Sequence, residues 1–97
     1  MMTQLSCDDI RQTLAAGATL LDVRTTDEFN NGALPNAKNI PLAILPVLAH
    51  EHLDKDETVF IYCRVGSRAM MAERILAGLG YRNAINIGGI HQYQHCN

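Results

Sequence analysis

Apolar and polar residues follow one another in blocks along this chain, and the blocks predict strands and helices in turn. Short apolar runs at residues 19–24 and 58–62, flanked by turn-forming residues, are typical of buried strands. Shorter runs at residues 39–40 and 84–87 predict two further strands. Apolar strands that alternate with helices indicate a parallel sheet covered by helices on both faces.

Helix boundaries are predicted from capping residues. Ser6 is expected to cap a first helix, because Asp9 follows three residues later, and Gly17 is expected to end it. Thr26 is expected to cap a brief helical turn that residues 30–32 end.

Two longer helices are predicted in the middle and the second half of the chain. Residues 42–53 are expected to form one helix with Pro46 in its first turn, where a missing N–H costs little. Residues 67–79 form the clearest helix, because their apolar residues recur at helical spacing. A last helical turn is expected after residues 84–87.

Composition and charge restrict the class of protein. The 97 residues suffice for one domain, expected to span residues 1–97, and 47% hydrophobic with 19% charged residues fits a folded globule. A net charge of −2 gives no broad basic surface, so no nucleic-acid partner is expected. No apolar run approaches the roughly 20 residues of a membrane span. With no secretory signal at the start, the predicted location is cytoplasmic, without membrane contact.

The cysteines are too few and too scattered for a disulfide framework or a Cys-x-x-Cys motif. Cys7, Cys63 and Cys96 are therefore expected to be reduced, with Cys7 inert in a helix. His91 and His95 lie four residues apart before Cys96, a spacing that suits a metal ion on a helix. No fourth ligand is evident, so neither a metal nor a cofactor is predicted.

Cys63 stands where a predicted strand gives way to a helix, and ligands of open parallel sheets bind beyond the carboxyl ends of strands. Gly66 lets the backbone curl so that N–H groups can face one anion, and the helix start adds a partial positive charge. Arg64 and Arg68 add two permanent charges, and all these features favour the thiolate. The predicted site is a catalytic Cys63 followed by an anion-binding loop of Arg64, Val65, Gly66, Ser67 and Arg68.

Three blocks of the sequence resemble the signatures of rhodanese-like domains. Residues 21–29 with 32–41 resemble the first signature, residues 62–69 the active-site loop and residues 86–90 the last signature. The blocks follow the family's order and cover nearly the whole chain. The resemblance implies an α/β fold with a central, mainly parallel five-stranded sheet and helices on both faces.

The resemblance also implies a thiosulfate sulfurtransferase that works by two displacements. Cys63 would take the outer sulfur of a donor such as thiosulfate and hold it as a persulfide. A thiophilic acceptor, which is cyanide, a small thiol or a protein cysteine, would then remove that sulfur. Arg64 and Arg68 are the candidates for binding the anionic end of the donor and the departing sulfite. Apart from the resemblance, resolution of a Cys63 persulfide by Cys96, as a disulfide, is kept as an alternative.

Asp22 and Arg24 end the neighbouring strand at the same edge of the sheet and resemble the family's Asp-Val-Arg element. We expect them to support the site through a buried ion pair or a hydrogen-bond network with Glu28 or the loop backbone.

Loop length separates this interpretation from a cysteine phosphatase or an arsenate reductase. The tyrosine-phosphatase signature places an arginine six positions after the cysteine, where this chain has Ala69, and Arg68 falls one residue earlier. The shorter loop suits one sulfur atom better than a tetrahedral phosphate. A persulfide carrier that serves one specific partner and a non-catalytic binding module both stay open as alternatives.

Overall fold

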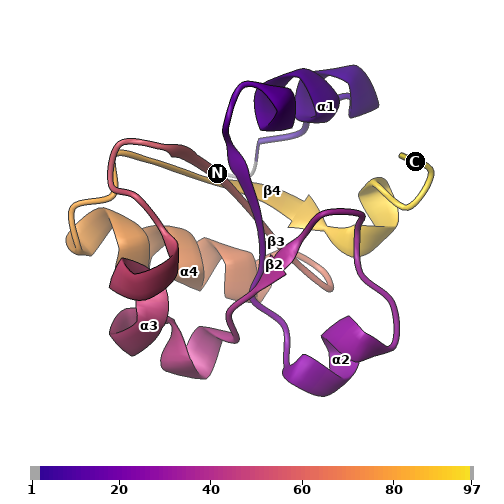
Figure 1. Cartoon of the computed structure of the whole chain (residues 1–97). Helices are drawn as coiled ribbons and strands as arrows, with labels where there is room; N and C mark the ends of the chain where they lie inside the picture. The colour runs from indigo at the N-terminus through magenta and orange to yellow at the C-terminus, as the bar shows by residue number, and fades with distance from the viewer. Residues whose placement is uncertain (1–2, 97) are drawn as a thin grey trace.

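The candidate site is built on the end of a central β-sheet. A computed structural model describes residues 3–96, and in this range the strands follow the order β2–β1–β3–β4, every neighbouring pair parallel (Figure 1). The strands are β1 (Thr19–Asp22), β2 (Lys38–Asn39), β3 (Thr58–Cys63) and β4 (Asn83–Gly89). The predicted parallel α/β sheet is confirmed.

The expected fifth strand is absent from residues 3–96, where the sheet has four strands. Beside the outer edge of β4, the backbone N–H of Thr3 donates a 2.9 Å hydrogen bond to the carbonyl of Asn86. A single contact of this kind does not make a strand ladder, so the expectation of five strands is corrected to four.

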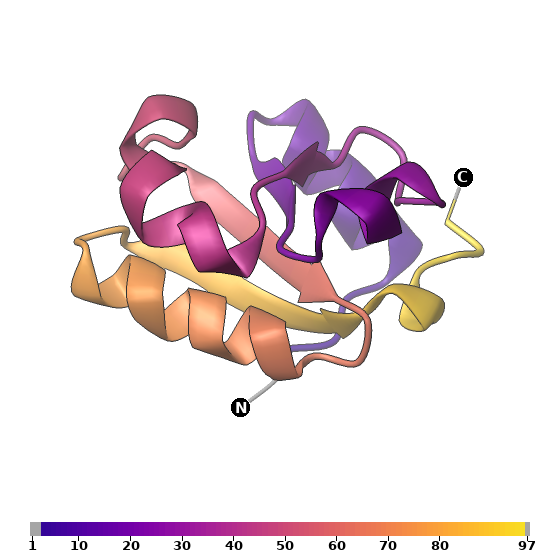
Figure 2. The same cartoon turned by 90° about the horizontal axis from the view of Figure 1, so that it is seen from below.

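Helices cover both faces of the sheet. They are α1 (Cys7–Ala15), α2 (Thr26–Asn30), α3 (Leu45–His52) and α4 (Ser67–Gly78), with short 3-10 turns η1 (Leu42–Ile44) and η2 (Ile90–Gln92). Figure 2 shows α3 and α4 side by side on one face of the sheet and α1 beyond the strands. No helix in residues 3–96 combines the length and apolar character needed to cross a bilayer.

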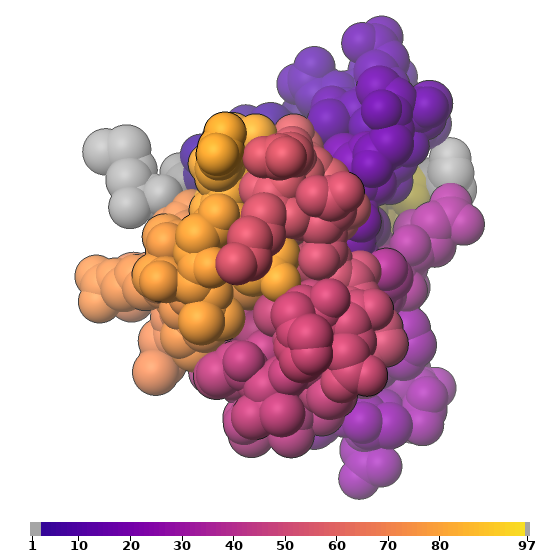
Figure 3. Space-filling view, turned by 60° about the vertical axis from the view of Figure 1, so that its left-hand side comes forward, coloured from indigo at the N-terminus to yellow at the C-terminus, as the bar shows by residue number. Residues whose placement is uncertain are grey.

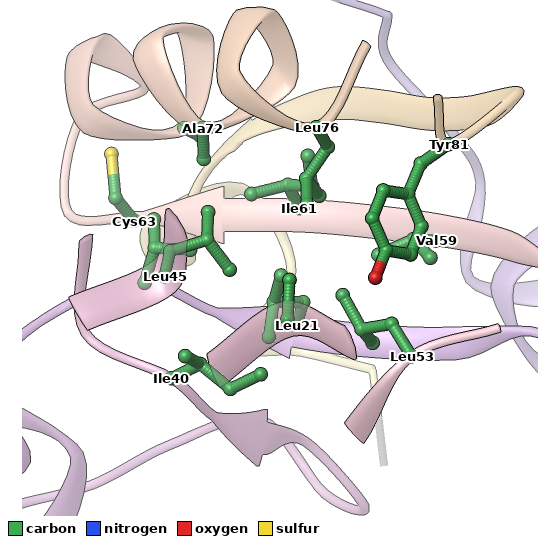
Figure 4. Close-up of a cluster of buried hydrophobic side chains, with 13 residues drawn as sticks. Leu21, Ile40, Leu45, Leu53, Val59, Ile61, Cys63, Ala72, Leu76 and Tyr81 are labelled. Carbon is green, nitrogen blue, oxygen red and sulfur yellow. The ribbon is translucent and has the colours of Figure 1, made fainter. Parts of the chain in front are cut away.

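The two faces have separate hydrophobic cores, and β3 contributes to both. Because successive side chains of a strand point to opposite faces, Val59, Ile61 and Cys63 join the core under α3 and α4 (Figure 4). Phe60 and Tyr62 join the core under α1 and η2. We call these the α3/α4 core and the α1 core. Cys63 therefore faces α4.

Helix α2 begins one residue earlier than predicted. Thr25, not Thr26, is the N-cap: its hydroxyl accepts from the N–H of Glu28, whose carboxylate accepts from the N–H of Thr25. This reciprocal pair needs an acidic or amide side chain three residues after the cap. Three residues after Thr26 stands Phe29, which has no acceptor, so Thr26 is wrong as the cap. The capping box of Ser6 and Asp9 in α1 is confirmed.

The predicted single helix over residues 42–53 is also wrong in its first turn. Residues 42–44 form η1, and α3 starts at Leu45 with Pro46 in its first turn. Pro46 has no N–H to donate to the carbonyl of Leu42, and its ring would clash with that carbonyl in a continuous α-helix. The preceding turn therefore tightens, and the N–H of Leu45 bonds to the carbonyl of Leu42 instead.

The end of the sheet opposite Cys63 is closed by two loops. Figure 3 views the molecule from this side, where the loops after α3 and α4 lie next to each other. The N–H of Arg82 donates to the carbonyl of Lys55, whose ammonium lies 5.9 Å from the ring centre of Tyr81.

Candidate active site

Cys63 is the last residue of β3, in the interior of the sheet, and its side chain is completely buried. Its sulfur accepts a hydrogen bond of 2.9 Å from the backbone N–H of Gly66. In Figure 4 the sulfur points away from β3 toward the first turn of α4. The sulfur therefore lies beneath the loop at the amino end of a helix, where backbone dipoles favour negative charge.

Gly66 makes the turn that brings its N–H to the sulfur. Its φ of +102° is a left-handed conformation that favours glycine, and it is the N-cap of α4. Its carbonyl accepts hydrogen bonds from the N–H of Met70 at 3.0 Å and from the side-chain amide of Asn86 at 3.3 Å. The loop is thus fixed to the sulfur on one side and to β4 on the other.

Two residues of β4, Asn86 and Gly89, support the loop. Both lie in the block that resembles the last family signature, but neither was among the predicted site residues. A Cβ atom at Gly89 would lie 2.5 Å from the carbonyl oxygen of Arg64, so only glycine lets the loop pack this closely. The side chain of Asn86 is buried and also accepts from the N–H of Gly88 at 2.9 Å. The signals available in the sequence were the polar Asn86 within a predicted apolar strand and the two glycines, Gly88 and Gly89, that follow it.

Arg68 reaches the site already paired. Its guanidinium donates two hydrogen bonds to the carboxylate of Glu28, at 2.7 and 3.0 Å. These bonds, followed by those from Thr25, lower the pKa of Glu28 to about 2, and the pKa of Arg68 is raised in return. Both side chains are about one third exposed, at 32% and 29%. An anionic substrate at Arg68 would have to compete with Glu28.

The remaining loop residues are exposed to different degrees. Arg64 is exposed, and its side chain has no hydrogen-bond or ion-pair partner within residues 3–96. It lines an open hollow of about 340 Å³ together with Arg24 and Glu28. Val65 is 71% exposed at the tip of the loop, and Ser67 is exposed at the first position of α4. Arg64 is therefore the loop cation that is available to an anion from solution.

Asp22 and Arg24 form the expected buried ion pair, at 2.7 Å. Asp22 also accepts from the backbone N–H of Arg24. The side-chain hydrogen bonds from the guanidinium to Asp22 raise the pKa of Arg24. Arg24 additionally donates to the carbonyl of Gly32 at 2.8 Å and lies 5.7 Å from the ring centre of Tyr62. The pair fixes the loop after α2 to the end of β1, whereas Glu28, the partner considered from sequence, binds Arg68.

The expectation of three reduced cysteines is wrong. Cys7 and Cys96 form a disulfide with a Cα–Cα distance of 5.3 Å, which leaves Cys63 as the free cysteine of the described residues. The bond joins residues separated by 89 positions, because α1 and the turn after η2 pack on the same core. Spacing along the sequence carries no sign of such a pairing, and Cys96 is not available as a resolving thiol while the bond is intact.

Comparisons with known proteins all point to one family. The family model of the rhodanese-like domain matches residues 6–96. The chain is 33% identical over 91 residues to a sulfurtransferase of Allochromatium vinosum, an alignment that covers 92% of this chain and 84% of that protein. It is 30% identical over 102 residues to the human thiosulfate:glutathione sulfurtransferase, with 91% and 89% of the two chains covered.

Solved structures agree with this result. A human single-domain sulfurtransferase superposes with a TM-score of 0.80 at 27% sequence identity, and the match covers 97% of this chain and 96% of that one. The likeness thus extends over the whole fold, including the strand, loop and helix that surround Cys63.

Proposed function

The chain belongs to the rhodanese-like family, in which the two relatives named above are sulfurtransferases, and we propose that Cys63 is its sulfur-carrying nucleophile. The observation that carries this proposal is the hydrogen bond from the N–H of Gly66 to the sulfur of Cys63, at the amino end of α4. A donor group aimed at a buried sulfur stabilises a thiolate and, after sulfur uptake, a persulfide.

In the first proposed step, the Cys63 thiolate attacks the outer sulfur of thiosulfate. A sulfur–sulfur bond forms, the bond within the donor breaks, and sulfite leaves with the electron pair. Arg64 is the loop cation most available to the sulfonate end, because its side chain is exposed and lacks an internal partner in the described residues. Arg68 can contribute only to the extent that the donor displaces Glu28.

In the second proposed step, an acceptor attacks the outer sulfur of the persulfide and Cys63 leaves as a thiolate. The terminal sulfur lies one bond, about 2 Å, beyond the buried Sγ and is correspondingly easier to reach. The name of the human relative pairs thiosulfate with glutathione, which supports a small thiol as the acceptor of this chain. Cyanide or a protein thiol would undergo the same displacement.

The cytoplasmic location stays a prediction from the sequence. The Cys7–Cys96 disulfide weighs against this location, because disulfides are uncommon where thiol reductants dominate.

The test combines two measurements on purified protein supplied with thiosulfate. Mass spectrometry should show one added sulfur on Cys63, and turnover should follow when a small thiol or cyanide is added. The Cys63→Ser variant should lose the added sulfur and retain less than roughly a thousandth of the turnover. The Cys96→Ser variant is the matched control and should keep both.

Each outcome discriminates between functions. Turnover that survives in Cys63→Ser would refute the mechanism. A persulfide that forms without turnover would identify a carrier, and the absence of both in the folded wild type would identify a binding module.

A further inference from the structure

We propose that Cys7, Cys96 and His95 form a binding site for a zinc-class cation when the disulfide between the two cysteines is reduced. One ligand atom from each of these residues lies within 4.8 Å of the other two. This cluster belongs to the α1 core side of the molecule, on the opposite face of the sheet from Cys63. The proposal goes beyond the proposed function and does not depend on it.

Contacts other than the disulfide anchor both cysteines. Cys7 is the first residue of α1, which is anchored in the α1 core by the buried side chain of Ile10. The N–H of Cys96 donates to the carbonyl of Tyr93 at 2.9 Å. Tyr93 is itself buried, with its hydroxyl bonded to the carbonyl of Ile87. Breaking the sulfur–sulfur bond therefore leaves both thiols near each other.

The three donors match the chemistry of zinc. Two thiolates and one imidazole are ligands that zinc prefers, and a water molecule completes the tetrahedron at such three-residue sites. Zinc–sulfur bonds of about 2.3 Å place two sulfurs about 3.8 Å apart, so side-chain rotation has to separate the former disulfide partners by roughly 2 Å. The amino end of α1 favours the thiolate of Cys7.

The site is accessible from solution. His95 is exposed and both cysteines are partly buried. Cys7 and Cys96 also line an open hollow of about 140 Å³, whose wall includes Leu34 and Pro35. A reductant and then an ion can reach the sulfurs by this route.

The disulfide and the metal site are mutually exclusive states of the same atoms. A dithiol reductant supplies two electrons and two protons, so that the disulfide becomes two thiols and the reductant becomes a disulfide. A zinc ion then displaces the two thiol protons and binds the neutral imidazole of His95. A disulfide oxidant takes the two electrons back, restores the Cys7–Cys96 bond and releases the ion.

The experiment uses the full chain carrying Cys63→Ser, so that only two thiols are present. After reduction with a phosphine under argon, the protein is titrated with Zn²⁺ against a chromogenic chelator and with Co²⁺, whose thiolate charge-transfer absorption reports sulfur ligands. We expect one ion per chain in the reduced protein and none in the oxidised protein.

Single substitutions in the same background identify the ligands. Cys7→Ser and His95→Gln should each weaken zinc binding at least tenfold, whereas His91→Gln is the matched control and should leave it unchanged. Circular dichroism checks that every variant is folded. Equal binding by the oxidised and reduced proteins, or unaltered binding in Cys7→Ser, would overturn the proposal, as would a reduced, folded protein that binds no zinc.

Discussion

The sulfurs on the two faces of the sheet are held in different ways. On the α3/α4 side, Cys63 is fully buried, and its sulfur is fixed by a backbone N–H only three residues further along the chain. On the α1 side, Cys7 and Cys96 are partly buried and are joined to each other across 89 positions of sequence. The first arrangement is local and leaves Cys63 as a free thiol. The second arises from tertiary packing and ties the chain together.

This difference separates stability from activity. The Cys7–Cys96 bond should contribute to the free energy of unfolding without affecting the loop at Cys63, because the two sites lie in different cores. Conversely, the contacts of Gly66 and Gly89 should set the activity of Cys63 while contributing less to the overall stability.

Removal of the disulfide should have the largest effect on stability. The Cys7→Ser/Cys96→Ser double variant should lose about 4 kcal/mol of unfolding free energy, because an unfolded chain without the cross-link has many more conformations. Chemical denaturation measures this loss, and a persulfide assay on the folded variant should give the wild-type result. Loss of persulfide formation in that folded variant would show that the two regions are coupled.

Gly89→Ala should disturb the loop at Cys63 directly. The added methyl group would lie 2.5 Å from the carbonyl of Arg64, so the loop must move, at a cost of about 1–3 kcal/mol, and turnover should fall. Gly78→Ala is the matched control, because a Cβ atom at Gly78, in α4, has no neighbour within 4 Å. The control should leave turnover intact, and equal turnover in both variants would contradict the role given to Gly89.

Glu28→Gln tests whether an internal carboxylate limits binding of the donor. Without its charged partner, Arg68 becomes available to thiosulfate, and the KM for thiosulfate should fall about fivefold, as expected for an ion pair worth about 1 kcal/mol. Steady-state kinetics measures this change, and Arg64→Ala in parallel should raise the KM. An unchanged KM in Glu28→Gln would show that Arg68 takes no part in binding the donor.

Acid should weaken the same ion pair, with the smallest effect. The pKa of Glu28 is about 2 in the folded protein and 4.5 for a free side chain, so its contribution is complete above pH 4.5 and is lost as the pH falls toward 2. Because both side chains are about one third exposed, the contribution should stay below about 1 kcal/mol. The free energy of unfolding, measured by chemical denaturation at several pH values between 5 and 2, should fall more steeply for the wild type than for Glu28→Gln. The same pH dependence of the unfolding free energy in both proteins would contradict a stabilising pair of Glu28 and Arg68.

The parts of the structure that were predictable from sequence are local ones. The strand before Cys63, the glycine turn and the helix after it are encoded within about 20 consecutive residues, and the structure has all three. The buried pair of Asp22 and Arg24 was likewise expected, because its members are two residues apart at the end of one strand.

The parts that escaped prediction depend on distant contacts or on small energetic differences. The pair of Arg68 and Glu28 spans 40 positions, so no spacing rule could distinguish an arginine that awaits a substrate from one already paired. Thr25 and Thr26 could both cap α2 by residue type. Only Thr25 has an acceptor side chain, that of Glu28, three positions later. The split of residues 42–53 depended on one missing N–H, that of Pro46.

The position of the Cys7–Cys96 bond has a topological consequence. It closes the backbone between Cys7 and Cys96 into a covalent ring. The exposed turn at residues 54–56 lies across the molecule from Cys63, between α3 and β3. A single peptide cleavage there would open the ring without dividing the protein into two molecules, and the same turn is a natural place for new termini in a circular permutant.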